Sequence, residues 1–182
     1  RNLPYMYGDC EVGFDYFDIV LDDGTNEPLF AVPKESLTEQ DYLIGLYSST
    51  LIKDGGELQI GIGSLGDAIV YFLQLRHSQQ RFYREILKTF SVEDHFAPIL
   101  ATKGDLSPFH EGLYSATEML IDGLIELFNF GILKREVFED LSLQRLLNSK
   151  EITLQVTKET VHKLIKMGAL SDPLTVKDIH FL

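Results

Sequence analysis

The sequence has 182 residues, of which 45% are apolar, and this size and composition are typical of one globular domain. The net charge of −12 argues against a nucleic-acid binder, because no Lys/Arg-rich face could displace the counterions of a phosphate backbone. With Cys10 as its single cysteine, the chain excludes an intrachain disulfide and a cysteine-based metal cage. No apolar run reaches the length of about 18 residues that a membrane-spanning helix needs. We therefore expect an acidic cytoplasmic protein.

The N-terminal third is predicted to contain two extended segments and a helix. Residues 14–21 mix aromatic and β-branched side chains before the turn residues 22–24, which is typical of a strand, and residues 29–32 form a second short extended piece. Thr38 followed by Asp41 indicates a capped helix start. The helix is expected to carry an apolar stripe at Leu43, Ile44, Leu46, Tyr47, Leu51 and Ile52, and to end before Asp54-Gly55-Gly56.

A glycine-rich turn follows between a short apolar strand at residues 58–60 and an amphipathic helix at about residues 65–76. Gly61, Gly63 and Gly66 let the backbone approach a ligand that a Cβ atom would keep away. The N–H groups of the following helix start would point at an anion placed there. The predicted ligand-binding residues are Gly61, Gly63, Ser64 and Gly66, and the ligand is a phosphate, a carboxylate or a reaction oxyanion.

The spacing of these glycines also matches the dinucleotide-binding fingerprint G-x-G-x-x-G, which is weak evidence by itself. That fingerprint needs a second strand ending in an acid about 20 residues further on. Glu85 has the right offset, but residues 81–88 are charged and predicted to be helical. A nicotinamide or flavin site is therefore the weaker alternative, and a tight turn without any ligand is another.

The remaining elements complete an alternating pattern. Residues 79–88 are predicted to be helical, and Pro98, Gly104 and Pro108 indicate a loop-rich stretch, so we interpret residues 78–109 as an insertion in a single domain. We expect strands at 113–117 and 152–156, and helices at 120–130 (ending at Gly131), 136–147 and 158–167. Strands alternating with helices predict an α/β fold with a largely parallel sheet flanked by helices.

Glu118 ends the strand predicted at 113–117, directly before a helix. In parallel α/β sheets, ligands bind outside the carboxyl ends of the strands. If the two strands are neighbours, Glu118 faces the glycine turn, and a carboxylate beside N–H donors suits covalent catalysis on an acyl compound. The alternative, equally open from these residues, is an acid that favours the helix N-terminus.

Other polar residues suggest structural roles. The five histidines (His77, His95, His110, His162 and His180) have no metal-ligand spacing, and His110 is expected at the surface rather than at the opening of a cleft. A basic cluster of Arg76, Arg81, Arg84 and Lys88 is expected to be a solvated helix face rather than a CoA-phosphate contact. Asp122 is expected to support the turn after Glu118 or to cap the next helix, and Phe128 and Phe130 are expected in the core.

Two motifs together resemble the C-terminal domain of the acetyl-CoA hydrolase/transferase family, which belongs to the class I CoA-transferases. One is Asp54-Gly-Gly-Glu-Leu-Gln-Ile-Gly-Ile-Gly63 with its following helix, and the other is Thr117-Glu118-Met119 with Asp122-Gly123. The similarity covers about residues 28–76 and 110–140. It implies a three-layer CoA-transferase architecture, with no cofactor and with CoA as a substrate.

The resemblance also implies a mechanism. Glu118 would attack an acyl-CoA thioester and form a glutamyl-CoA thioester, which water or a small carboxylate then resolves, and Gly61 and Gly63 would line the same pocket. The implied partners are acyl-CoA, a small carboxylate and further copies of the chain in a homo-oligomer. A CoA- or nucleotide-binding module without chemistry is the alternative from another functional class.

This sequence departs from the family pattern at several places. Ser115-Ala116 replace the residues usual before Thr-Glu, Leu65-Gly66 stand where proline is common, and residues 78–109 lengthen the gap between the motifs. The N-terminal domain and the downstream glycine loop of the family have no counterpart within residues 1–182. Since the chain also starts at Arg1 instead of Met, we expect it to be a fragment of a longer enzyme.

Overall fold

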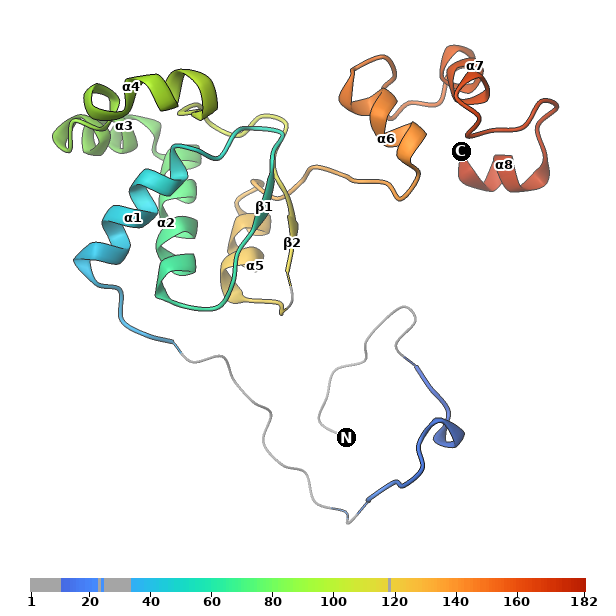
Figure 1. The fold of residues 1–182 in the computed structure, drawn as a ribbon, viewed down its shortest axis with the longest axis horizontal. Helices are drawn as coiled ribbons and strands as arrows, with labels where there is room; N and C mark the ends of the chain where they lie inside the picture. The colour runs from blue at the N-terminus through green and yellow to red at the C-terminus, as the bar shows by residue number, and fades with distance from the viewer. Residues whose placement is uncertain (1–10, 23, 25–33, 118) are drawn as a thin grey trace.

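The computed structural model describes residues 11–22, 24, 34–117 and 119–182. Within these ranges the fold is mixed α/β, with eight α-helices and one parallel sheet of two strands (Figure 1). The expected α/β class is therefore confirmed. None of the helices in the described ranges is both long enough and apolar enough to cross a membrane.

The helices are α1 (Glu39–Ser49), α2 (Ser64–Ser78), α3 (Gln80–Thr89), α4 (Val92–Lys103), α5 (Asp122–Asn129), α6 (Leu141–Asn148), α7 (Lys158–Lys166) and α8 (Val176–Phe181). The strands are β1 (Glu57–Gln59) and β2 (Tyr114–Ala116), and a short 3₁₀ helix, η1, spans Phe14–Tyr16.

Two expected strands are wrong, and a third lies outside the described residues. Residues 14–21 contain η1, and residues 152–156 are irregular. A strand needs a partner for its backbone groups, and no described residue forms a ladder with either segment. The expected extended piece at residues 29–32 falls outside the described ranges.

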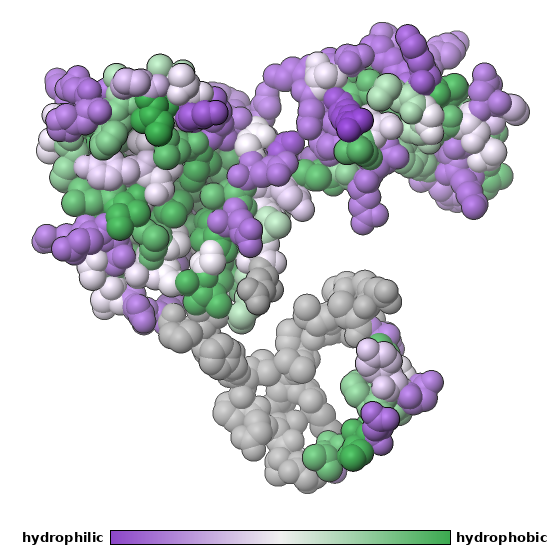
Figure 2. Space-filling model, in the orientation of Figure 1, coloured by the Kyte–Doolittle hydropathy of each residue, from purple (hydrophilic) through white to green (hydrophobic). Residues whose placement is uncertain are grey.

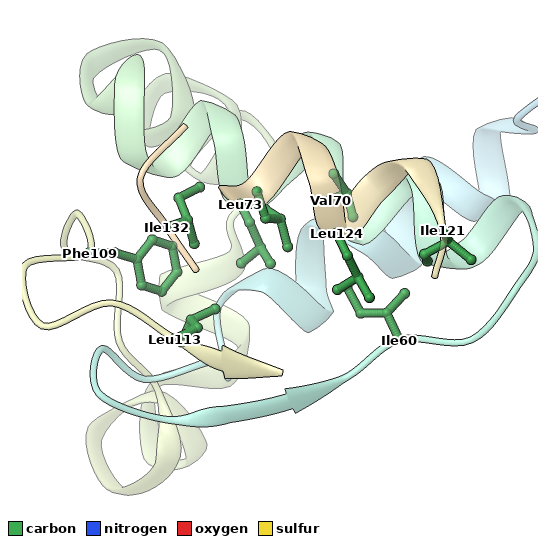
Figure 3. Packing of buried hydrophobic residues seen from close by; sticks show 9 residues of the cluster. Ile60, Val70, Leu73, Phe109, Leu113, Ile121, Leu124 and Ile132 are labelled. Carbon is green, nitrogen blue, oxygen red and sulfur yellow. The ribbon is translucent and has the colours of Figure 1, made fainter. Parts of the chain in front are cut away.

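The two strands and helices α2 and α5 enclose the central core. β1 and β2 run parallel, with Glu57 opposite Tyr114 and Gln59 opposite Ala116. Side chains from the strand ends and from the two helices converge on one another in Figure 3. The buried cluster consists of Ile60, Val70, Leu73, Phe109, Leu113, Ile121, Leu124, Leu127 and Ile132.

The start of α1 follows the sequence prediction. The Thr38 hydroxyl accepts the Asp41 N–H at 3.2 Å, and the Asp41 carboxylate accepts the Thr38 N–H at 2.9 Å, which completes a capping box. The expected apolar stripe is only partly buried, because Leu46 faces the core whereas Ile44 and Leu51 are exposed.

Helices α1 to α4 share a second core. Leu46, Phe72, Leu75, Tyr83, Leu87 and Val92 form its buried cluster. The loop expected around Pro98 is wrong, because α4 continues through this proline after a kink at Phe96, where the backbone leaves helical geometry (φ −119°). The kink accommodates the break in hydrogen bonding that proline imposes.

Helices α6 and α7 and the segments that follow them form a third, separate cluster of Leu146, Ile152, Leu164 and Leu170, and α8 comes after it in the chain. An extended segment joins them to the rest (Figure 1). The helix expected at 136–147 starts only at Leu141, because the Asp140 carboxylate caps it by accepting the Leu143 N–H at 2.7 Å.

Phe128 and Phe130 are not core residues, contrary to expectation, since they are 69% and 46% exposed. Helix α5 places Leu124 and Leu127 on its buried face, three residues apart. Phe128 lies at the edge of that face and remains exposed although it follows Leu124 by four residues.

Candidate functional site

The carboxyl ends of β1 and β2 lie side by side at one edge of the sheet. Since the strands are parallel with Gln59 opposite Ala116, the glycine turn leaves one strand where Thr117 leaves the other. The neighbouring strands on which the predicted site depended are therefore present. Glu118, the predicted nucleophile, lies outside the described residues.

The glycines of the turn have two different environments. A Cβ added to Gly61 or Gly63 would meet no atom within 4 Å. A Cβ on Gly66 would lie 2.7 Å from the Gly61 carbonyl oxygen and 2.9 Å from Cγ2 of Ile60. Gly61 and Gly63 therefore face open space, whereas Gly66 lets the first turn of α2 pack on the end of β1.

Helix α2 begins without a side-chain cap. Its N-cap residue is Gly63, whose φ of +131° favours glycine, and Ser64 is the first helical residue. The free N–H groups of such a helix start attract negative charge, so this turn can stabilise an oxyanion or a carboxylate.

Ser64 lies close to the start of α1. The backbone and hydroxyl of Thr38, with a smaller contribution from the Ser64 hydroxyl, hold the pKa of Asp41 below its ordinary value. Asp41 is therefore a carboxylate beside the glycine turn.

Hydroxyl groups fix the backbone at the end of β2. The Ser115 Oγ donates to the Leu58 carbonyl at 2.7 Å and thus ties β2 to β1, and the Thr117 Oγ1 donates to the Met119 carbonyl at 2.6 Å. Met119 and Leu120 are exposed. Thr117 and Met119 are therefore held close together beyond the end of β2, on the same side as the glycine turn.

Asp122 does not cap α5, because the N-cap residue is Ile121 and no side chain bonds there. Instead, the Asp122 carboxylate pairs with the Lys34 ammonium at 2.5 Å. Asp122, and to a lesser extent Asp67 and Glu126, raise the pKa of Lys34. Lys34 is thus a cation near the starts of α2 and α5 that no sequence pattern indicated.

The expected basic surface is wrong for Arg76, whose side chain is fully buried. Its guanidinium donates to the carbonyls of Ser49 at 2.9 Å, Ile52 at 2.5 Å and Ser107 at 2.6 Å. It also stacks 4.3 Å from the centre of the Phe109 ring. Arg81, Arg84 and Lys88 are exposed as expected.

Asp54 has a role that the sequence did not reveal. Its carboxylate accepts the backbone N–H groups of Gly55, His110, Glu111 and Gly112 at 2.8–3.1 Å. Partial burial alone would raise the pKa of Asp54, but these four bonds outweigh it and lower the pKa. Asp54 therefore joins the segments that lead into β1 and β2, at the end of the sheet opposite the glycine turn.

Two histidines form hydrogen bonds in the region around Asp54 and Phe109. His110 is exposed, as expected, and contributes only its backbone N–H to Asp54. The Nδ1 atom of His77 accepts the Phe109 N–H at 3.2 Å, and burial lowers the pKa of this imidazole. Among the described residues, no three His, Cys, Asp or Glu side chains are grouped to hold a metal ion.

Comparison with known proteins gives one partial match. No family model and no solved structure matches the chain. Over 74 residues the chain is 31% identical to the 4-hydroxybutyrate coenzyme A transferase of Clostridium kluyveri. The match covers 41% of this chain and 17% of that protein, so the chain spans only a small part of its relative. This similarity supports a relationship to CoA transferases.

Proposed function

We propose that this chain belongs to an acyl-CoA hydrolase or CoA-transferase that works through a glutamyl-CoA thioester, with Glu118 as the nucleophile. The observation that carries the proposal is the parallel pairing of β1 and β2, with Gln59 opposite Ala116. This pairing brings the open glycine turn and the Thr117 turn to one edge of the sheet, where α/β proteins bind ligands. The similarity to a CoA transferase supports the same chemistry.

The proposed reaction begins with attack of the Glu118 carboxylate on the thioester carbonyl. CoA leaves as the thiolate, and an acyl-glutamyl anhydride forms. The thiolate then attacks the glutamyl carbonyl, which releases the acyl group as a carboxylate and leaves the glutamyl-CoA thioester. A second carboxylate takes over CoA through the reverse steps, or water hydrolyses the thioester.

The backbone around Gly61, Gly63 and Ser64 is proposed to stabilise the oxyanion of these steps. An uncapped helix start offers N–H donors that need no reorganisation when negative charge develops. Gly66 contributes indirectly by holding that helix start against β1. Acetate and acetyl-CoA are the proposed substrates, in a cytoplasmic homo-oligomeric enzyme without a further cofactor.

The test compares Glu118→Gln and Glu118→Ala with the wild-type full-length protein in acyl-CoA cleavage and CoA transfer to acetate. We expect both variants to lose turnover, while Glu93→Gln, an exposed acid on α4, keeps it. Borohydride added with acyl-CoA should reduce the trapped thioester on the peptide that contains Glu118. Normal turnover in the Glu118 variants would contradict the proposal.

Binding and cleavage measurements on the same full-length protein can distinguish an enzyme from a binding module. The open space beside Gly61 and Gly63 is compatible with both, because it would admit a ligand with or without catalysis. Calorimetric binding of CoA together with thioester cleavage supports the enzyme, whereas binding without cleavage supports a module that only holds CoA. Titration with NAD(H) tests the weaker dinucleotide alternative.

A further inference from the structure

A cleft of about 590 Å³ lies at the end of the sheet opposite the glycine turn. Its floor contains Gly55 and Glu111, which lie in the segments leading into β1 and β2, and its far wall comes from α6 and the residues after it. In Figure 1 this is the region between the sheet and α6. Hydrophilic side chains gather there in Figure 2.

The polar lining is rich in cations, although the whole chain carries a net charge of −12. Three cationic residues (Lys134, Arg135 and Lys150) and two acids (Glu111 and Glu136) line the cleft, together with the amides of Gln144 and Asn148. Lys150 pairs with Glu111 at 2.8 Å, and Arg135 lies 3.4 Å from Glu57. Lys134 forms no ion pair with any described residue, so one cation in the cleft is available to an anion.

An apolar wall completes the cleft. Phe138, Leu147 and Leu154 line it beside the cations. A site with positive charge at one side and apolar or aromatic side chains at the other suits a ligand that joins a phosphate to a flat ring.

The backbone at Lys150 has a left-handed conformation that favours glycine. Helices α5, α6 and α7 end in the same way, with the residue at the left-handed position donating its N–H to the carbonyl three residues earlier. That residue is Gly131 (φ +70°) after α5 and Gly168 (φ +78°) after α7, but it is Lys150 (φ +59°) after α6. Glycine adopts this conformation without strain and lysine does not, and such strain is typical of functional sites.

We propose that this cleft binds a nucleotide-type phosphate ester, with the phosphate on Lys134, Arg135 and Lys150 and the ring against Phe138, Leu147 and Leu154. The site is separate from the glycine turn and does not depend on Glu118. Gly55 lies in its floor. The Lys134 side chain packs over the neighbouring Gly112, where an added Cβ would come within 2.4 Å of it.

Calorimetric titration of the full-length protein with ADP at low salt tests the proposal. We expect ADP to bind more tightly than pyrophosphate, which lacks the ring, and than adenosine, which lacks the phosphates. Glu118→Gln should leave ADP binding unchanged, so a failed nucleophile proposal does not affect this one. Competition by CoA would identify the nucleotide end of CoA as the occupant, and lack of competition would identify a free nucleotide.

Two variants separate a binding role from a structural one. Lys134→Gln and Lys150→Gly should each weaken ADP binding about fivefold, since each removes one exposed charge contact. The matched control Lys103→Gln, on the exposed end of α4, should bind ADP like the wild type. Lys150→Gly should also melt at an unchanged or higher temperature, because glycine relieves the left-handed strain.

Absence of ADP binding at millimolar concentration would overturn the proposal. Wild-type ADP affinity in both Lys134→Gln and Lys150→Gly would overturn it as well. In that case Lys150 would serve only to hold α6 to the loop of Glu111.

Discussion

The Nη2 atom of Arg76 lies 3.2 Å from Oδ2 of Asp105, in an ion pair whose cation is fully buried. The same carboxylate oxygen accepts the backbone N–H of Asp54 at 3.0 Å, and Oδ1 accepts the Ser107 N–H at 2.9 Å. Asp54 in turn accepts four backbone N–H groups around the strand starts. Arg76, Asp105 and Asp54 thus form one polar network that fixes how α2 and the two strands meet.

Replacing Arg76 should destabilise the fold more than replacing any of the exposed basic residues Arg81, Arg84 and Lys88. Arg76→Met keeps most of the side-chain length, but it leaves three carbonyls without their buried donor and Asp105 without its buried counterion. The expected loss in the free energy of unfolding is about 3–5 kcal/mol, measured by urea denaturation. Arg84→Met on exposed α3 is the control and should change stability by less than about 0.5 kcal/mol.

Acid should weaken the Asp54–Asp105 network. Burial raises the pKa of both carboxyls, but hydrogen bonds, together with Arg76 for Asp105, outweigh it and lower both pKa values in the folded state. A carboxyl with a lowered folded pKa stabilises the protein fully above its unfolded pKa of about 3.9. This stability is lost as the pH falls below that value towards the folded pKa.

The Asp54→Asn variant checks this pH dependence. We expect it to be less stable than the wild type at pH 7 and to show a smaller loss of stability between pH 5 and the acid limit, in thermal melts across that range. Equal pH profiles for the two proteins would show that Asp54 does not contribute through its charge.

Two glycine substitutions should show which glycine of the turn is needed for folding and which is needed for activity. Gly66→Ala places a Cβ 2.7 Å from the Gly61 carbonyl oxygen, so it should lower the melting temperature. Gly61→Ala meets no atom within 4 Å, so its melting temperature should stay close to that of the wild type while CoA binding or turnover falls. Unchanged activity in a stable Gly61→Ala variant would remove Gly61 from the proposed pocket.

Removing the capping box of α1 should cost a predictable amount of stability. Thr38→Ala deletes the hydroxyl that accepts the Asp41 N–H, and we expect a loss of about 1 kcal/mol in urea denaturation. Thr38→Ser keeps the hydroxyl and should retain most of the stability. If Thr38→Ala were neutral, the cap would not contribute to the folded state.

Local sequence patterns predicted the elements whose causes are local. Capping, periodicity and turn chemistry predicted the Thr38 cap, the strands around the two motifs, the helix after Gly63 and the end of α5 just before Gly131. A largely parallel sheet was also expected, whereas the adjacency of the two strands was only a condition of the predicted site, and the structure meets it. The resemblance to acetyl-CoA hydrolase/transferases supplied the nucleophile Glu118, which remains a prediction.

Other features of the fold depend on tertiary packing, so local sequence patterns could not predict them. Arg76 was expected in solvent, but α2 turns it toward the carbonyls of Ser49, Ile52 and Ser107, where buried hydrogen bonds and Asp105 compensate its charge. Asp54 resembled a helix-ending residue and instead joins two segments more than fifty residues apart. Residues 14–21 have the composition of a strand, but a strand forms only where another backbone can pair with it.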